Sequence, residues 1–441
     1  MIINIDNDNI TKIKNKLFYN NAIIHTKIYQ KYKSEIEKMG IMFSGYDENL
    51  NKRRNELISE LKSKGAIFRN NNKSIYINKI STACLECKKG NRSLTLFFSL
   101  ECNRDCYFCS NKNQENYETY VKNDKDVIAE YEALKYKDNL LAIGLTGGEP
   151  LICVDKVCSF FSYVKKESPN IHTRLYTNGD LVDEDILAKL LDSGLDEIRF
   201  SIKIEDNDSI INSIIKKLIK AKAYISTVMV EMPVIPGTVN EMKALLNSLE
   251  LANIDGINLL EFLFPLINSL EYKRRGFKLK YRPYEVLYNY TYAGGLPISG
   301  SEEDCLELLL YGISNSFKMG IHYCSLENKL FSQIYNQNMN TKLLDYEVFS
   351  QKDFFIKTAK VYGNQCLIVL EQMNKLGEER FYFDKNNNIL EFHPILINTL
   401  PEGIEVGISY NVVETLNNRK ALKEVKLDLT YPEIFQFESD I

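Results

Sequence analysis

"LTLFFSLECNRDCYFC" (residues 94–109) joins a short apolar run to a loop that carries three cysteines. The run predicts a buried strand over Leu94–Ser99, because it has the length of a strand and ends at polar residues. The loop then places Cys102, Cys106 and Cys109 within eight positions and holds no fourth cysteine. The polar residues between the thiols disfavour inert core cysteines, so the spacing indicates a metal site that the loop alone leaves incomplete.

Short apolar runs alternate with amphipathic stretches from residue 93 to about 262. This alternation predicts βαβ units and a parallel sheet, curved into an open partial barrel or a doubly wound sheet. The expected strands are Leu94–Ser99, Leu140–Thr146, Thr173–Thr177, Glu197–Ile202, Ile225–Glu231 and Gly256–Glu261. The expected helices lie at roughly 126–136, 154–168, 183–193, 208–222 and 239–253.

Polar or glycine-bearing segments follow the next three strands. They are "TGGEP" (146–150), "TNGD" (177–180) and "SIK" (201–203). Parallel α/β folds place function at the carboxyl ends of their strands. We therefore expect these segments to lie on one rim together with the cysteine loop.

The flanking sequence predicts accessory regions at both ends. Residues 1–80 contain two helical patterns and the hairpin-like "AIFRNNNKSIYIN" (66–78), which fits a small helical or winged-helix-like domain. Strand-like runs dominate from about 345 to 441 and predict a β-rich C-terminal domain. The expected domains are therefore 1–80, 81–340 and 341–441.

The composition narrows the class of protein. The chain has 441 residues, 44% of them hydrophobic, and a net charge of −4, which gives no general reason to expect nucleic-acid or membrane binding. No signal peptide or membrane span is evident, so a cytoplasmic location is expected. Five of the ten cysteines fall within 26 residues, which favours metal ligation or redox chemistry over disulfides.

Three thiols suit an iron–sulfur cluster whose fourth iron is left without a protein thiolate. An open coordination position is typical of a catalytic rather than a structural metal. A zinc knuckle is the alternative, and it would need a fourth ligand from elsewhere in the chain. The four histidines, at positions 25, 172, 322 and 393, are all distant from the loop in sequence.

"CNRDCYFC" (102–109), with Phe108 before the last cysteine, resembles the first motif of the radical S-adenosylmethionine (SAM) superfamily, and "TGGEP" resembles its second motif. The resemblance covers about residues 93–262 and implies a partial (β/α)6 barrel. It also implies that Cys102, Cys106 and Cys109 ligate a [4Fe–4S] cluster.

The same resemblance implies roles around SAM. Phe108 would pack beside the adenine, and Gly147, Gly148 and Glu149 would hold the methionyl amino group. Candidates for the ribose, the carboxylate and the fourth rim position are Thr177, Asn178, Ser201 and Lys203. The plainer interpretations are an ordinary strand-to-helix turn at the glycines and a solvated lysine at the end of a strand.

The reaction implied is reductive cleavage of SAM to methionine and a 5′-deoxyadenosyl radical, which abstracts a hydrogen atom from a substrate. An electron donor such as flavodoxin or ferredoxin would be needed. Accessory domains at both ends favour a peptide or protein residue as the substrate.

A second cysteine set consists of Cys84, Cys87 and Cys324. It could hold an auxiliary [4Fe–4S] cluster, or a zinc ion with His322 as fourth ligand. With "RGFKLK", "GSEE" and "HYCS", the set resembles a largely uncharacterised, mostly archaeal group related to pyruvate-formate-lyase activating enzymes. Unrelated free thiols are the alternative, and Cys153, Cys158, Cys305 and Cys366 are expected in the core.

Three other functions stay open at this point. One is an activase that installs a glycyl radical on a partner enzyme. Another is a nucleic-acid-modifying radical enzyme, for which the basic run 272–282 is the only feature, and such a run is more often a solvated face. The last is a zinc- or cluster-stabilised regulatory protein in which residues 1–80 bind DNA or protein.

Overall fold

The computed structural model describes residues 1–87, 92–287, 294–416 and 419–441. The chain divides into two compact units. The larger unit comprises residues 36–283 and 291–332, and the smaller comprises 1–35, 284–290 and 333–441. The three domains expected from the sequence stay a prediction.

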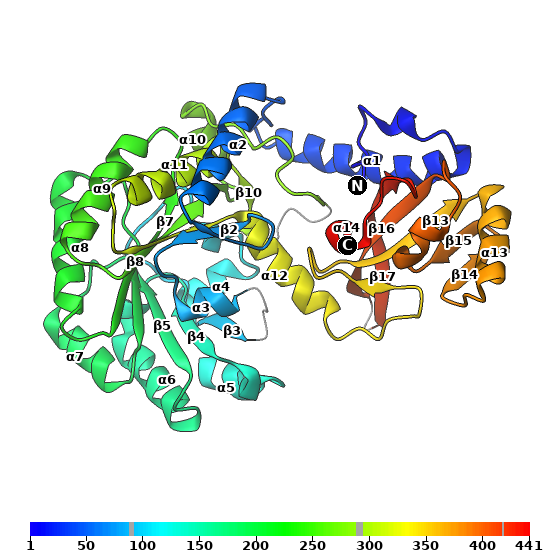
Figure 1. The fold of residues 1–441 in the computed structure, drawn as a ribbon. Coiled ribbons are helices and arrows are strands. Elements are labelled where there is room, and N and C mark those ends of the chain that lie inside the picture. Colours follow the sequence, from blue (N-terminus) through cyan, green and yellow to red (C-terminus); the bar gives the residue numbers. More distant parts are fainter. Residues whose placement is uncertain (88–91, 288–293, 417–418) are drawn as a thin grey trace. The chain divides into compact units, whose positions relative to one another are not determined.

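The larger unit is built on the expected parallel sheet (Figure 1). Each strand pairs in parallel with the next along the chain, which confirms the predicted βαβ units. The strands are β3 (Ser93–Phe97), β4 (Ala142–Thr146), β5 (His172–Thr177), β6 (Glu197–Phe200), β7 (Thr227–Val234) and β8 (Gly256–Glu261). The fold is thus the mixed α/β class that the sequence predicted.

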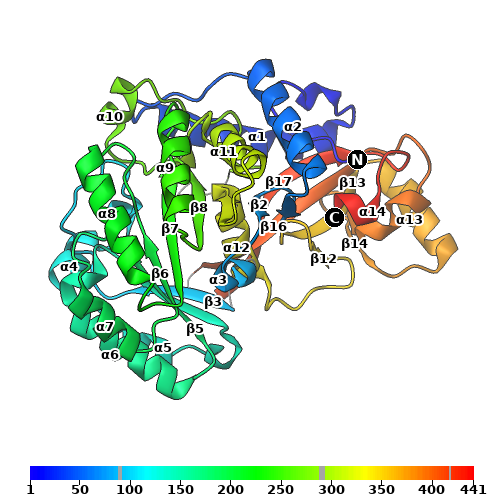
Figure 2. The ribbon, with the colours of Figure 1, turned by 60° about the vertical axis from the view of Figure 1, so that its left-hand side comes forward.

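The crossover helices lie along the outer side of these strands (Figures 1 and 2). They are α5 (Val127–Glu132), α6 (Val154–Glu167), α7 (Glu184–Asp192), α8 (Asp208–Ala221) and α9 (Val239–Leu251). Helix α8 shows why they form: the Asn207 side chain accepts from the amide of Ile210 at the start, and Ile214 and Leu218 bury one apolar face.

The sheet continues beyond the six predicted strands. Strand β11 (Gly320–Cys324) pairs in parallel with β8, and β2 (Ser74–Ile77) pairs antiparallel with β11. Strand β1 (Ile67–Arg69) completes the predicted hairpin with β2. The hairpin therefore extends the main sheet of the larger unit.

Further elements of the larger unit pack around this sheet. They are α2 (Glu48–Ser63), α3 (Thr82–Glu86), α4 (Tyr117–Lys122), β9 (Leu263–Phe264), α10 (Ser269–Arg274), β10 (Leu296–Pro297) and α11 (Ser301–Ser314). Helix α12 (Leu326–Asn338) follows β11 and runs from the larger unit into the smaller one. No helix among the described residues combines the length and apolar character needed to cross a membrane.

The smaller unit contains a separate antiparallel sheet, which confirms the predicted β-rich C-terminal region. Its strands are β12 (Val348–Phe349), β13 (Ile356–Tyr362), β14 (Phe381–Asp384), β15 (Ile389–Phe392), β16 (Val406–Leu416) and β17 (Arg419–Thr430). Its helices are α1 (Lys16–Glu37), α13 (Gln365–Leu376) and α14 (Phe437–Asp440). Phe18 of α1 stacks on Tyr362 at a ring distance of 4.9 Å, so the N-terminal helix shares the core of this sheet.

Candidate active site

The three loop cysteines lie directly beyond the carboxyl end of β3. Cys102 is exposed, while Cys106 and Cys109 are partly buried. The backbone amide of Arg104 donates to the Cys102 sulfur at 3.4 Å. Burial raises the pKa of the Cys102 and Cys109 thiols, and the neighbouring Cys106 raises both further. The three sulfurs are therefore close enough to interact electrostatically.

The "TGGEP" segment packs directly against the cysteine loop. The amide of Gly148 donates to the Ser99 carbonyl at 3.1 Å, and the amide of Glu149 donates to the Glu101 carbonyl at 2.7 Å. A Cβ on Gly147 would lie 2.2 Å from the Ser99 carbonyl oxygen, and one on Gly148 would lie 1.8 Å from that of Glu101. Glycine is required here because the two loop backbones touch.

Glu149 connects the second rim segment to the third. Its side chain is only 3% exposed and accepts from the Thr177 hydroxyl at 2.8 Å and from the Asn178 amide at 2.6 Å. Burial raises the pKa of this carboxyl, although hydrogen bonds from Asn178, Leu151 and Thr177 oppose the rise. The structure thus brings together three of the predicted site residues.

Arg104 is a residue of this site to which the sequence analysis assigned no role. Its guanidinium forms ion pairs with Asp180, on the third rim loop, and with Asp206, at 2.6 Å. The adjacent Asn103 amide donates to Asp180 at 3.0 Å, and its carbonyl oxygen accepts from Asn178 at 2.7 Å. The available signal was weak: a polar loop between the cysteines and an aspartate closing "TNGD".

Ser201 and Lys203, at the fourth rim position, lie beside the cysteine loop. The amide of Ser201 donates to the Thr177 carbonyl at 2.8 Å. Burial raises the pKa of the Cys102 thiol, and the positive charge of Lys203 opposes this rise. Lys112 lowers the pKa of Asp105, and Lys203 adds to that effect. Ser201 and Lys203 are partly exposed and line the edge of the cysteine loop. Their roles toward SAM stay a prediction.

Phe108 of the cysteine loop belongs to an aromatic cluster. Its ring makes edge contacts with Tyr107 at 5.0 Å and with Phe262, just beyond β8, at 5.8 Å. The Asn268 side chain donates to the Tyr107 carbonyl at 3.0 Å, and the Arg275 guanidinium lies 4.4 Å from the Tyr107 ring. These contacts hold the cysteine loop against residues that follow β8.

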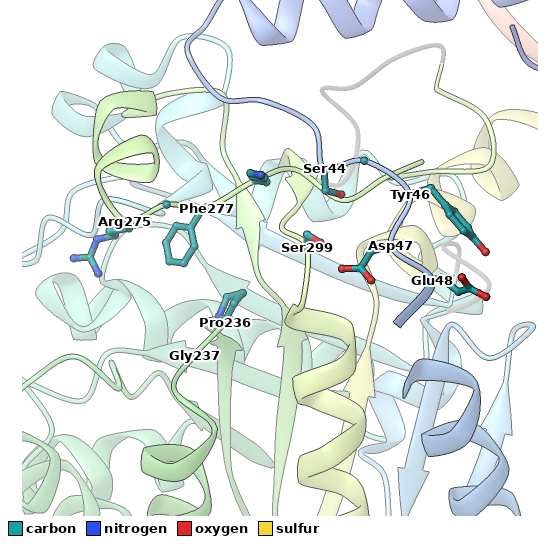
Figure 3. A pocket seen from close by; sticks show the side chains of 12 residues that line it. Ser44, Tyr46, Asp47, Glu48, Pro236, Gly237, Arg275, Phe277 and Ser299 are labelled. Atoms are coloured by element: carbon teal, nitrogen blue, oxygen red, sulfur yellow. The ribbon is translucent and has the colours of Figure 1, made fainter. Parts of the chain in front are cut away.

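A cavity of about 690 Å³ adjoins this aromatic cluster (Figure 3). It is lined by the segment 44–48, by Pro236 and Gly237 beyond β7, by residues 275–278, and by Ser299. Arg275 both lines the cavity and contacts Tyr107 of the cysteine loop. The cavity carries charged, aromatic and small polar side chains.

Glu231 and Glu261, which the sequence places near the ends of the fifth and sixth strands, are already engaged by cations. Glu231 forms an ion pair with Arg199, and Glu261 one with Lys280 at 2.9 Å. The amide of Leu326 also donates to Glu261 at 2.9 Å. Both carboxylates therefore serve internal networks.

Residues 96–249 match the family model of the radical SAM superfamily, so this part of the chain carries a radical SAM domain, which supports an enzyme. The chain is also similar to a Methanocaldococcus jannaschii protein described as "Putative glycyl-radical enzyme activating enzyme". The identity is 29% over 313 residues, which cover 68% of this chain and 78% of the relative.

Streptococcus suis SuiB is among the solved structures to which the chain is similar. The form bound to S-adenosylmethionine gives a TM-score of 0.38 at 15% identity, covering 64% of this chain and 56% of that structure. The form bound to its precursor peptide SuiA gives a TM-score of 0.33 at 16% identity, covering 54% of this chain and 53% of that structure. This chain thus spans a little over half the length of these solved chains.

The radical SAM family implies a [4Fe–4S] cluster and SAM. The residues present fit the cluster, since three neighbouring thiols lie on one loop and a backbone amide donates to one of the sulfurs. Among the described residues, no three His, Cys, Asp or Glu side chains converge on a single metal ion.

Proposed function

We propose that this enzyme cleaves SAM reductively at a [4Fe–4S] cluster held by Cys102, Cys106 and Cys109. The observation that carries the proposal is the packing of the three-thiol loop against the glycine pair and Glu149, at the carboxyl ends of β3 and β4. Backbone contact fixes one segment against the other. A ligand of the open iron would therefore meet the second motif at a set position.

When bound, the cluster supplies the electron that splits SAM into methionine and a 5′-deoxyadenosyl radical, which takes a hydrogen atom from the substrate. The residues of the chain bind SAM and orient it. Glu149 holds the Thr177–Asn178 segment, and Lys203 places a positive charge near Cys102, where it suits a carboxylate. An external one-electron donor such as flavodoxin or ferredoxin, and a cytoplasmic location, are part of the proposal.

The substrate we propose is a residue of a peptide or protein. The cavity beside Tyr107 and Arg275 supports this, because it brings charged, aromatic and small polar side chains next to the cysteine loop. A second candidate is an activase that forms a glycyl radical on a partner enzyme. The similarity to the M. jannaschii protein over 78% of its length favours this candidate, and its substrate would also be a protein residue.

A nucleic-acid substrate receives less support from the basic run 272–282. Arg275 is ion-paired with Glu205 and Glu271, and Lys280 lies between Glu261 and Glu302. Much of the positive charge of this run is therefore neutralised internally.

The test is anaerobic reconstitution followed by reduction with dithionite in the presence of SAM. We expect 5′-deoxyadenosine, and an electron paramagnetic resonance signal of the reduced cluster that changes when SAM is added. Replacing Cys102, Cys106 and Cys109 by alanine should abolish both, while Cys153→Ala, outside the loop, should retain both. A cluster signal indifferent to SAM would contradict the proposal.

The substrate is tested by co-production with the products of neighbouring genes. A mass change in a short peptide would support peptide modification. A glycyl-radical doublet on a large partner enzyme would support the activase.

A further inference from the structure

The second cysteine set comes together inside the larger unit, although its members are far apart in sequence. Asn258 of β8 links two of its segments: its amide donates to the Cys84 sulfur at 3.4 Å, and its carbonyl oxygen lies 2.9 Å from His322 Nδ1. His322 and Cys324 point to the same face of β11, because side chains alternate along a strand. Cys84 and Cys324 therefore face a common interior.

Helix α12 brings the third thiol to the same place. The Asn328 amide donates to the Cys324 sulfur at 3.5 Å, and the Ser332 hydroxyl donates to the Cys87 carbonyl at 2.8 Å. Asn328 and Ser332 are four residues apart and share one helix face. Cys87 and Cys324 thus flank the same face of α12, and Cys84 is three residues from Cys87 on α3.

Polar hydrogens converge on these sulfurs. Arg199 is 1% exposed and its guanidinium lies 3.4 Å from the Cys84 sulfur, in addition to the amides of Asn258 and Asn328. Donors of this kind favour sulfur that carries negative charge. A set of inert core thiols would not need three N–H groups.

A second buried arginine adds an unsatisfied donor. Arg174 is 5% exposed, and its Nε has no hydrogen-bond partner in the described part of the chain. Its guanidinium and that of Arg199 lie 5.0 and 5.6 Å from the same Tyr176 ring. The Nη2 of Arg174 donates to the Thr95 hydroxyl at 3.1 Å, so the unpaired Nε leaves this cation able to donate to an anionic group.

A zinc ion explains this arrangement poorly. The two ring nitrogens of His322 lie 2.9 Å from Ser74 Oγ and 2.9 Å from Asn258 Oδ1, so neither is free to ligate a metal. All ten cysteines are free thiols.

We propose that Cys84, Cys87 and Cys324 bind a second iron–sulfur cluster inside the partial barrel, with Arg174 and Arg199 facing its negative charge. The chain supplies three thiolates, so one iron is left for a ligand that is not a cysteine. This cluster is distinct from the SAM-cleaving one, and its existence does not depend on which substrate the enzyme takes.

Metal content after anaerobic reconstitution tests the proposal. Wild type should hold about eight irons and eight sulfides per chain, as two cubanes require. The iron content should fall to about half when Cys102, Cys106 and Cys109 are replaced by alanine. It should also fall to about half when Cys84, Cys87 and Cys324 are replaced. The variant that combines both sets should hold no iron. Cys366→Ala, a buried cysteine of the other unit, should keep the wild-type content.

Other outcomes would overturn it. One is the loss of all iron when Cys102, Cys106 and Cys109 are replaced by alanine. Another is about one zinc per chain in place of the second cluster. A third is a disulfide between Cys84 and Cys87, found by peptide mapping. Should the triple replacement prevent folding, Cys324→Ala alone should still lower the iron content to about half that of the wild type. Failure of SAM cleavage in the wild type is a separate result, because it contradicts the proposed function without changing the iron count.

Discussion

The Arg104 guanidinium is ion-paired with the carboxylate of Asp180, 76 residues along the chain. Arg104 lies between two cysteines of the loop, and Asp180 ends the segment that follows β5. This pair, with the second contact to Asp206, ties the cysteine loop to two neighbouring rim loops. The loop is therefore held in place before any cofactor binds.

Arg104→Gln should loosen the cysteine loop. Removing the guanidinium leaves Asp180 and Asp206 without their partner, which we expect to cost about 1–3 kcal/mol of local stability. Iron should then be lost faster to a chelator, measured by absorbance of the cluster. Lys189→Gln is the control, since the Lys189–Asp155 pair is 53% and 85% exposed and contributes little. Equal loss rates in both variants would contradict a holding role.

Glu149→Gln should weaken SAM binding while the cluster stays in place. Glutamine has the size of glutamate, but an NH2 donor replaces one of its two acceptor oxygens. That donor would face the backbone amide of Asn178 or the Thr177 hydroxyl. We expect the dissociation constant to rise roughly 10- to 100-fold. Calorimetry on the reconstituted protein measures the constant, and iron analysis confirms the cluster. Asp183→Asn, which changes only the cap of α7, should leave SAM affinity unchanged.

Gly148→Ala should destabilise the larger unit and displace the cysteine loop. Its methyl group would lie 1.8 Å from the Glu101 carbonyl oxygen, a backbone atom that cannot yield without moving the loop. A loss of about 2 kcal/mol or more is expected in urea unfolding, together with poor cluster incorporation. Gly45→Ala, where a methyl group meets nothing within 4 Å, is the matched control and should be near neutral.

Glu303 should make the larger unit less stable as the pH rises. Burial, helped by the negative charge of Glu302, raises the pKa of this carboxyl from 4.5 to about 7. Between those values the folded protein binds a proton that the unfolded chain has released, so stability falls as the pH increases, by up to ~3 kcal/mol above pH 7.

Glu303→Gln removes this titration. The variant should exceed wild type in stability at pH 8 and match it near pH 4.5, as measured by urea unfolding. Glu307→Gln should behave oppositely, because Lys243 and Arg53 lower the pKa of Glu307 despite its burial. An unchanged pH slope in Glu303→Gln would show that another group is responsible.

The order of strands and helices could be predicted because it rests on local patterns. Alternating apolar runs and amphipathic stretches placed β3 to β8 and their crossover helices within a few residues of their ends. What periodicity did not reveal was β11, a seventh parallel strand that joins the sheet after a long excursion, and the addition of the hairpin to it. Pairing of strands distant in sequence has no local signature.

The sequence by itself determined which residue types the candidate site contains, since three closely spaced thiols and a glycine pair can be read without coordinates. Only the tertiary structure decided what holds them, namely the Arg104–Asp180 pair and the carbonyl contacts that exclude a side chain at Gly148. It also placed the buried Arg199 beside Cys84. The physical reason is that ligand type and spacing are local properties of the chain. Charge pairing, burial and backbone contact arise between segments that only folding brings together.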